Sequence, residues 1–123
     1  MQQERKKLTL RSAAADVDLP GLDVAGARTM REAILRRLCV AATYNRTPVT
    51  LAPHILYTRH GEPFVDGVVL EREGKPPKEL KLGTFKLAGL VGLSLTPLNF
   101  EVQPLFEADN PKYADVTLSV VAR

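Results

Sequence analysis

The sequence predicts a mainly β fold of the α+β class, in which one helix precedes a small β-barrel or sandwich. Apolar residues recur at every second position in two stretches, 49–57 and 64–70, which is the period of a half-buried strand. A short polar turn at 59–62 separates the stretches and offers Gly61 for a left-handed conformation. The two stretches therefore form a β-hairpin, and further short alternating stretches follow it.

Composition limits the class of protein. The chain has 123 residues, the length of one domain, with 45% hydrophobic and 25% charged residues. A single cysteine, Cys39, excludes an internal disulfide framework. No stretch approaches the roughly 18 apolar residues of a transmembrane helix, and residues 1–7 lack the apolar core of a signal peptide. We therefore expect a cytoplasmic protein without a membrane partner.

The net charge of +3 permits weak attraction to nucleic acid or to an anionic ligand and requires neither. Residues 1–27 are polar and basic at first, then rich in small residues with a Pro-Gly break. This pattern predicts a flexible or extended N-terminal arm over 1–27 and a folded domain over 28–123.

A helix is expected over 29–38. Thr29 with Glu32 forms a capping-box pattern, and Met30, Ile34 and Leu38 form an apolar stripe. Arg36 and Arg37 fall in the last turn, where cations complement the negative end of the helix dipole. A solvated face explains these arginines, and a face turned towards nucleic acid is the alternative.

The strands follow in order. We expect strands at 40–44, at 49–57 and 64–70 in the hairpin, at 80–87, at 91–95, at 100–106 and at 116–120. The apolar phase flips across Gly83, which predicts a β-bulge or bend there, and Pro97 is expected to end its strand. The expected core consists of Ile34, Leu38, Leu51, Ile55, Phe64, Val68, Phe85, Leu93 and Phe100.

Motifs of catalysis are not recognisable in this sequence. It contains neither a glycine-rich phosphate loop nor a Gly-x-Ser-x-Gly elbow. His54 and His60 match no zinc spacing, and Cys39 is expected to be a small core residue. We therefore expect a protein that is not an enzyme and that has no cofactor and no metal site.

Several short segments, in their order, resemble the bacterial WYL domain, a family named for a Trp-Tyr-Leu run. Residues 53–57 (Pro-His-Ile-Leu-Tyr) resemble the segment upstream of that run, and Pro63, Phe64 and Val65 stand in its place. Residues 84–90 (Thr-Phe-Lys-Leu-Ala-Gly-Leu) resemble the family's later Phe-Arg-Leu-Asp-Arg-Ile segment. The resemblance covers about 29–106, in a chain that has no Trp. We expect no complete helix-turn-helix in the residues before 28.

The resemblance implies an N-terminal helix followed by a small Sm-like or SH3-like β-barrel. It also implies a part in transcription regulation, because the family's members are usually regulators whose domain binds a ligand or nucleic acid. The residues of the resembling segments and of the adjoining turn that suit such a site are Tyr44, Arg46, His54, Tyr57 and Lys86. A basic side chain beside an aromatic ring holds a phosphate and stacks a base, although packing and solvation explain the same residues.

Two functions remain open from the sequence. The first is a non-enzymatic regulatory or sensor domain that binds a small anionic ligand, a nucleotide or single-stranded nucleic acid on the barrel surface. The second is a protein–protein interaction module that acts through a barrel edge or the N-terminal arm. The sequence leaves the oligomeric state open.

Overall fold

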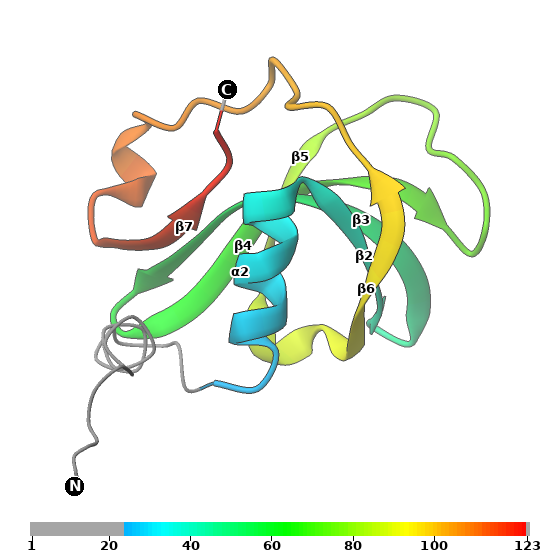
Figure 1. Ribbon diagram of the computed structural model, residues 1–123, viewed down its shortest axis with the longest axis horizontal. Coiled ribbons are helices and arrows are strands. Elements are labelled where there is room, and N and C mark those ends of the chain that lie inside the picture. The colour runs from blue at the N-terminus through cyan, green and yellow to red at the C-terminus, as the bar shows by residue number, and fades with distance from the viewer. Residues whose placement is uncertain (1–23, 123) are drawn as a thin grey trace, which may run out of the picture.

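A computed structural model describes residues 24–122 as one helix followed by one antiparallel sheet (Figure 1). The elements in chain order are α2 (Ala27–Arg36), β2 (Leu38–Tyr44), β3 (Thr47–Arg59), β4 (Glu62–Arg72), β5 (Leu82–Lys86), the 3-10 turn η1 (Leu87–Gly89), β6 (Val91–Asn99), the 3-10 turn η2 (Pro111–Tyr113) and β7 (Val116–Val120). The expected mainly β fold with a leading helix is confirmed at this level.

The sheet has the strand order β5-β4-β3-β2-β6, and β7 pairs with β3 off this path. β3 serves two partners because it is long: its first half pairs with β2, and Ile55–Thr58 pair with β7. The sheet of the described residues is not closed into a barrel, so the closed barrel is not confirmed.

The hairpin expected from the period of two is confirmed as β3 and β4. Their register runs from Val49 opposite Arg72 to Arg59 opposite Glu62. His60 and Gly61 form the turn with φ angles of 54° and 80°, a left-handed pair that matches the twist of the flanking strands.

The register of β3 against β4 is irregular, whereas the register of β5 against β4 at Gly83 is regular. β5 pairs with β4 through Gly83 with no register shift, and Leu80 lies outside the strand and is exposed. The β3–β4 register shifts instead beside Gly67, where a Cβ atom would stand 2.6 Å from the carbonyl oxygen of Ala52. The expected bulge was therefore placed on the wrong strand.

Helix α2 begins two residues earlier than expected. Its N-cap is Gly26 with no side-chain cap, so the capping box at Thr29 does not form. Arg37 ends the helix in a left-handed conformation with φ of 54°, and its N–H caps the carbonyls of Ala33 and Ile34.

Two later expectations also change. β6 continues past Pro97 to Asn99, which an edge strand tolerates because proline there removes no ladder hydrogen bond. Residues 100–106 form no strand, yet Phe100 and Phe106 are buried by packing against β3.

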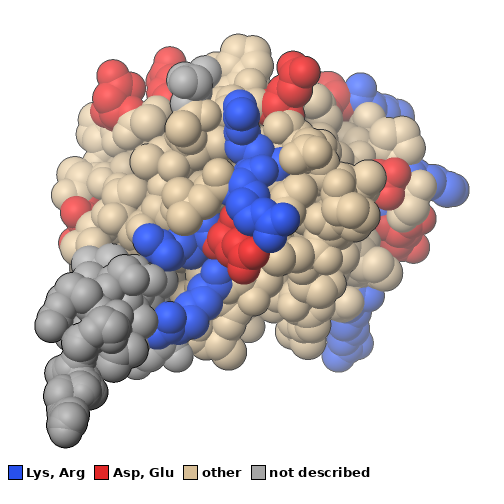
Figure 2. Space-filling view, in the orientation of Figure 1, with Lys and Arg blue, Asp and Glu red and all other residues tan. Residues whose placement is uncertain are grey.

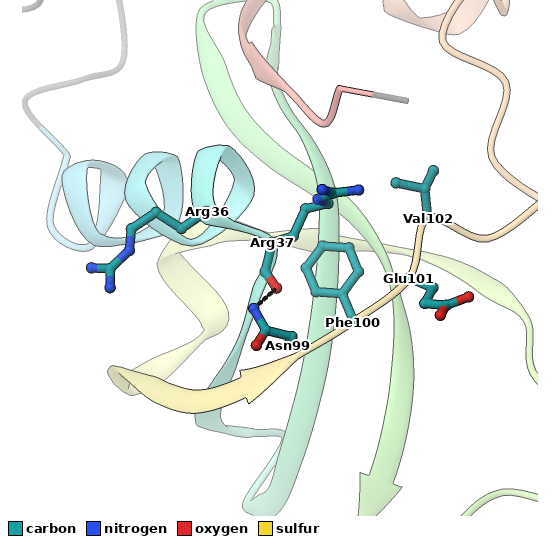
Figure 3. Close-up of a pocket in the computed structure, with 6 residues that line it drawn as sticks. All are labelled: Arg36, Arg37, Asn99, Phe100, Glu101 and Val102. Atoms are coloured by element: carbon teal, nitrogen blue, oxygen red, sulfur yellow. Dashed lines mark hydrogen bonds between the residues drawn. The ribbon is translucent and has the colours of Figure 1, made fainter.

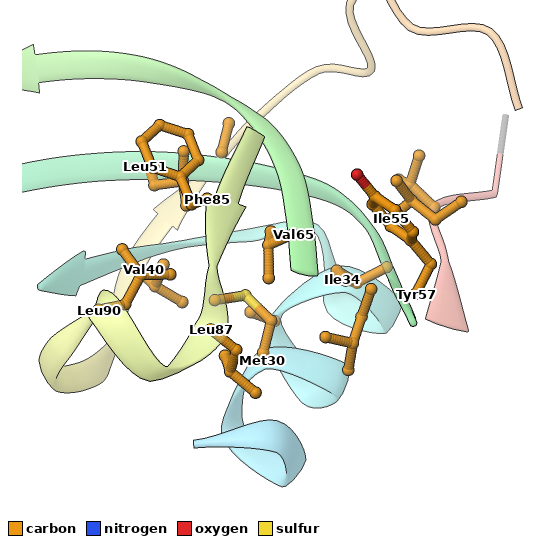
Figure 4. Close-up of a cluster of buried hydrophobic side chains, with 14 of the residues drawn as sticks. Met30, Ile34, Val40, Leu51, Ile55, Tyr57, Val65, Phe85, Leu87 and Leu90 are labelled. Atoms are coloured by element: carbon orange, nitrogen blue, oxygen red, sulfur yellow. The ribbon is translucent and has the colours of Figure 1, made fainter. Parts of the chain in front are cut away.

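The core lies between α2 and the concave face of the sheet (Figure 4). Met30 and Ile34 of the helix pack with Val65 and Ile55 of the hairpin and with Leu87 of η1. Of the expected core, Ile34, Leu38, Leu51, Ile55, Val68, Phe85 and Phe100 are buried, while Phe64 and Leu93 are half-buried.

Most of the expected N-terminal arm, residues 1–23, lies outside the described residues. Its last part belongs to the fold, because Val24 packs on the core and Ala27 is fully buried. No helix within residues 24–122 combines the length and the apolar character needed to span a bilayer.

Candidate functional site

The five residues singled out from the sequence do not form one site. Three of them lie at the surface or at its edge. Tyr44 is the last residue of β2 and is half-buried. Its ring is edge-on to that of Phe85, with 5.0 Å between the ring centres. Arg46 is exposed in the next turn with φ of 65°, and Lys86 is exposed at the end of β5, 3.4 Å from a carboxylate oxygen of Glu62.

The other two, His54 and Tyr57, are fully buried on β3. The Nδ1 atom of His54 lies 2.9 Å from the Ala52 carbonyl oxygen, and its Nε2 accepts the N–H of Gln103 at 3.0 Å. This pattern assigns the ring proton to Nδ1. The ring also packs against Phe100 and Phe106 at 5.1 and 5.4 Å. His54 therefore anchors the segment after β6 to the middle of β3.

Tyr57 belongs to a buried polar cluster centred on Asp66 of β4. The carboxylate accepts the hydroxyls of Tyr57 at 2.7 Å and Tyr113 at 2.6 Å, and it pairs with Lys112 Nζ at 2.8 Å. Lys112 also donates to Thr84 Oγ1 at 3.0 Å. The Asp66 cluster thus ties η2 to the hairpin through a carboxylate that has no solvent exposure.

The ionisation of this cluster follows from its contacts. Burial alone would raise the pKa of the Asp66 carboxyl, but the hydrogen bonds from Lys112, Tyr113 and Tyr57 outweigh it and hold that pKa below its usual value. Burial and the bond to Asp66 raise the pKa of both tyrosines well above the ordinary range. The tyrosines therefore stay protonated as donors, and the cluster has the character of a structural anchor and not of an acid–base site.

Sequence reasoning missed Asp66, although the sequence carries a signal for it. Asp66 interrupts an apolar run in a strand that the structure buries on both faces between Val65 and Val68. A carboxylate in such a strand needs donors from elsewhere in the chain, and these come from Tyr57 on β3 and from η2, 46 to 47 residues further on.

Helix α2 and its C-cap carry more basic than acidic side chains. Arg28, Arg31 and Arg36 lie on the helix and Arg37 is its C-cap, whereas Glu32 is the one acidic residue of α2. We call this group of four arginines the arginine face. Figure 2 shows basic side chains crossing the middle of this view, where Figure 1 places α2, with acidic atoms among them.

The arginine face is only partly neutralised. Arg36 Nη1 lies 2.6 Å from Glu32, so this pair is internally balanced. Within residues 24–122, the side chains of Arg28 and Arg37 have no ion-pair partner, and both residues are exposed.

A hollow of about 570 Å³ lies beside the C-terminal end of this face (Figure 3). Its walls are Arg36, Arg37, Asn99, Phe100, Glu101 and Val102. The Arg37 carbonyl accepts Phe100 N–H at 3.0 Å and Asn99 Nδ2 at 3.3 Å, which fixes the backbone at the corner. Figure 3 shows the Arg37 side chain extending over the Phe100 side of the hollow, whereas Arg36 points away from it.

Other kinds of chemistry have little support in the described residues. Cys39 is buried, and burial and the nearby Glu71 carboxylate raise the pKa of its thiol. No group of three or more His, Cys, Asp or Glu side chains between residues 24 and 122 is placed to hold a metal ion.

Comparisons of the chain with protein-family models, with curated proteins and with solved structures found no match.

Proposed function

We propose that this protein is a non-enzymatic regulatory or sensor domain that binds single-stranded nucleic acid along the arginine face of α2. The observation that carries the proposal is four arginines and one glutamate along α2 and its C-cap, with Arg28 and Arg37 unpaired in the described part of the chain. Phosphate contacts of this kind supply most of the affinity of sequence-independent binding.

The length of the face favours an extended anion over a compact one. A helix of ten residues is about 15 Å long, so its two ends present Arg28 and Arg37 as separate charges. A small anion contacts one end only, whereas successive phosphates of a strand contact several arginines. A small anionic ligand held by Arg37 in the 570 Å³ hollow is the narrower form of the same proposal.

A single strand is also favoured over a duplex. The inner side of α2 is packed on the sheet through Ala27, Met30 and Ile34, so the helix lies flat against the sheet (Figure 1). Helices that read duplexes insert into the major groove, which this placement does not favour. A net charge of +3 is modest for a duplex-binding domain.

The resemblance to the WYL family and its Sm-like or SH3-like barrel remains part of this proposal. In the sheet order β5-β4-β3-β2-β6, the late strand β6 pairs with β2, which is the first strand after the helix. A small barrel is likewise built from a run of antiparallel strands, although the described sheet is not closed. The transcription-related role remains part of the proposal and rests on this resemblance.

The test measures the binding of a fluorescent single-stranded oligonucleotide by anisotropy. Arg28→Gln and Arg37→Gln each remove one unpaired charge, and each is expected to weaken binding several-fold because one phosphate contact is lost. Lys78→Gln is the matched control, since it removes one exposed charge from the loop after β4. Equal effects of all three variants, or no binding by the unaltered protein at low salt, would contradict the proposal.

The second candidate function is the protein-interaction module, and one observation favours it. Within residues 24–122, β6 has a strand partner on one side only, and Val91 and Leu98 at its two ends are 64% and 55% exposed. An exposed edge accepts an added strand. If the oligonucleotide does not bind, a Lys substitution at Ser94 in mid-strand tests this alternative, because it is expected to abolish capture of an extended peptide.

A further inference from the structure

A second hollow, of about 380 Å³, lies at the tip of the β3–β4 hairpin, where η2 approaches it. Its walls are Arg59, His60, Pro111, Lys112, Ala114 and Asp115. Unlike the arginine face, it combines fixed charges of both signs.

Both cations of the hollow are held in place by neighbouring groups. The guanidinium carbon of Arg59 lies 5.5 Å from the centre of the Phe64 ring, which orients the group. Lys112 Nζ is bound to Asp66 and Thr84 at 2.8 and 3.0 Å. An ammonium has three donors, so Lys112, which is partly exposed, keeps one N–H for a ligand.

The anion of the hollow is fixed as well. Asp115 Oδ2 accepts the main-chain N–H of His60 at 3.0 Å. That N–H is oriented by the left-handed turn of His60 and Gly61. The second oxygen of Asp115 makes no hydrogen bond among the described residues, so it is available as an acceptor.

The hollow carries charges of both signs, and these nearly cancel. Asp66 compensates Lys112, which leaves the Arg59 cation and the Asp115 carboxylate as the uncompensated pair. A phosphate or a strand of nucleic acid meets the Asp115 carboxylate as a like charge, which disfavours it. A molecule with one positive and one negative group satisfies both ends.

We propose that the hollow at the hairpin tip binds a small zwitterion, a free α-amino acid. The ligand carboxylate accepts from Arg59 and from the remaining donor of Lys112, and its ammonium donates to the second oxygen of Asp115. Such charge-assisted contacts are the strong hydrogen bonds of protein sites. This site is independent of the arginine face and adds a small-molecule input to the proposed function.

The experiment is an amide NMR titration of the intact protein with glycine and alanine. Acetate, methylammonium and inorganic phosphate serve as probes that each carry charge of only one sign. The amino acids are expected to shift the His60 and Asp115 amide signals saturably, and each single-sign probe is expected to bind about tenfold or more weakly.

Variants assign the two ends of the ligand. Asp115→Asn keeps an acceptor for His60 N–H but removes the charge, and Arg59→Gln removes the opposite cation. Each is expected to lower the affinity for glycine about tenfold or more. Glu62→Gln and Lys86→Gln are matched controls, because both residues lie near the same turn but outside the hollow, and they are expected to leave the affinity unchanged.

Three results would overturn the assignment. One is the absence of saturable shifts with either amino acid. Another is binding of acetate or phosphate as tight as that of glycine. The last is equal loss of affinity in the hollow variants and their controls. If the His60 amide signal is lost in Asp115→Asn before any ligand is added, the substitution has disturbed the turn. The effect of Arg59→Gln on the affinity for glycine then decides whether the assignment holds.

Discussion

Asp66 is the residue whose burial demands most from its surroundings. A buried carboxylate without partners is strongly destabilising, and here three donors from β3 and η2 surround it. Because these donors favour the charged form, folding and the ionisation of Asp66 are coupled.

This coupling predicts a dependence of stability on pH. The pKa of Asp66 is lower in the folded protein than the ordinary value of about 3.9. Its contribution to the free energy of unfolding is therefore fully present above that ordinary value and is lost as the pH falls through the lower folded-state pKa. Urea unfolding between about pH 6 and about pH 3 measures it.

The variant Asp66→Asn separates this effect from the other carboxyl groups. It is expected to be less stable than the unaltered protein at neutral pH, with a difference that narrows as the pH falls. Asp109→Asn, at an exposed position, is the control and is expected to follow the unaltered protein. A difference between Asp66→Asn and the unaltered protein that stays constant with pH would rule out the coupling.

At the scale of elements, the bend of the long hairpin depends on close approach of backbone at Gly67. A Cβ atom there would lie 2.6 Å from the Ala52 carbonyl oxygen and 3.1 Å from the Pro53 Cα. Backbone atoms cannot move aside as a side chain does. One of the two register shifts of β3 against β4 falls at this position, so we attribute this bend to the glycine.

Gly67→Ala is accordingly expected to destabilise the protein by about 2–3 kcal/mol or more, because the added methyl overpacks against the main chain. Gly83→Ala, on the neighbouring strand, meets ring atoms of Phe85 at 3.2 and 3.3 Å and the Gly67 carbonyl oxygen only at 3.9 Å, and it is expected to cost less. Chemical unfolding of the two variants checks the order, and a reversed order would refute this account of the bend.

The sequence was sufficient to predict the elements that have a clear apolar period. It was insufficient to predict features that depend on contacts with distant segments. The alternation in β3 and β4 and the apolar stripe of α2 were readable, since each depends on neighbours in the chain. The bend at Gly67 was not, because its cause is a carbonyl on another strand. Likewise, the cap of α2 was misread, because Thr29 fits a capping pattern that the preceding Gly26 displaces.

At the scale of the molecule, the segment after β6 crosses β3 without forming a strand until β7. It is held by a row of aromatic rings. The centre of the Phe106 ring lies 5.4 Å from that of His54 and 5.9 Å from that of Tyr113. Tyr113 in turn meets Tyr57 edge-on at 4.9 Å. These contacts and the Asp66 cluster join the C-terminal part of the chain to the hairpin.

Phe106→Ala is therefore expected to cost about 3–5 kcal/mol of unfolding free energy, as for other buried aromatic residues. The adjacent Leu105, 49% exposed, provides the control, and Leu105→Ala is expected to change stability by less than about 0.5 kcal/mol. Thermal or urea unfolding measures both. Similar losses in the two variants would mean that the row of rings does not hold this segment.

The candidate site was less readable than the fold for a related reason. Residues with suitable chemistry, such as His54 and Tyr57, lie in the interior, where His54 binds Gln103 far along the chain and Tyr57 binds Asp66 on the adjacent strand. The arginines of α2 were visible in the sequence, yet a solvated face was the preferred explanation for them. What sets them apart is that they follow one another along α2 and its C-cap, with a hollow beside the C-terminal end.

The most direct test of the central proposal is the salt dependence of oligonucleotide affinity. Two phosphates, contacted by the unpaired Arg28 and Arg37, predict a slope of log K against log salt of about −1.4 for a single strand. Replacing Arg28 and Arg37 together by Gln is expected to reduce the steepness of that slope by about 1.4. A slope near zero, or a slope that the double substitution leaves unchanged, would contradict binding along α2.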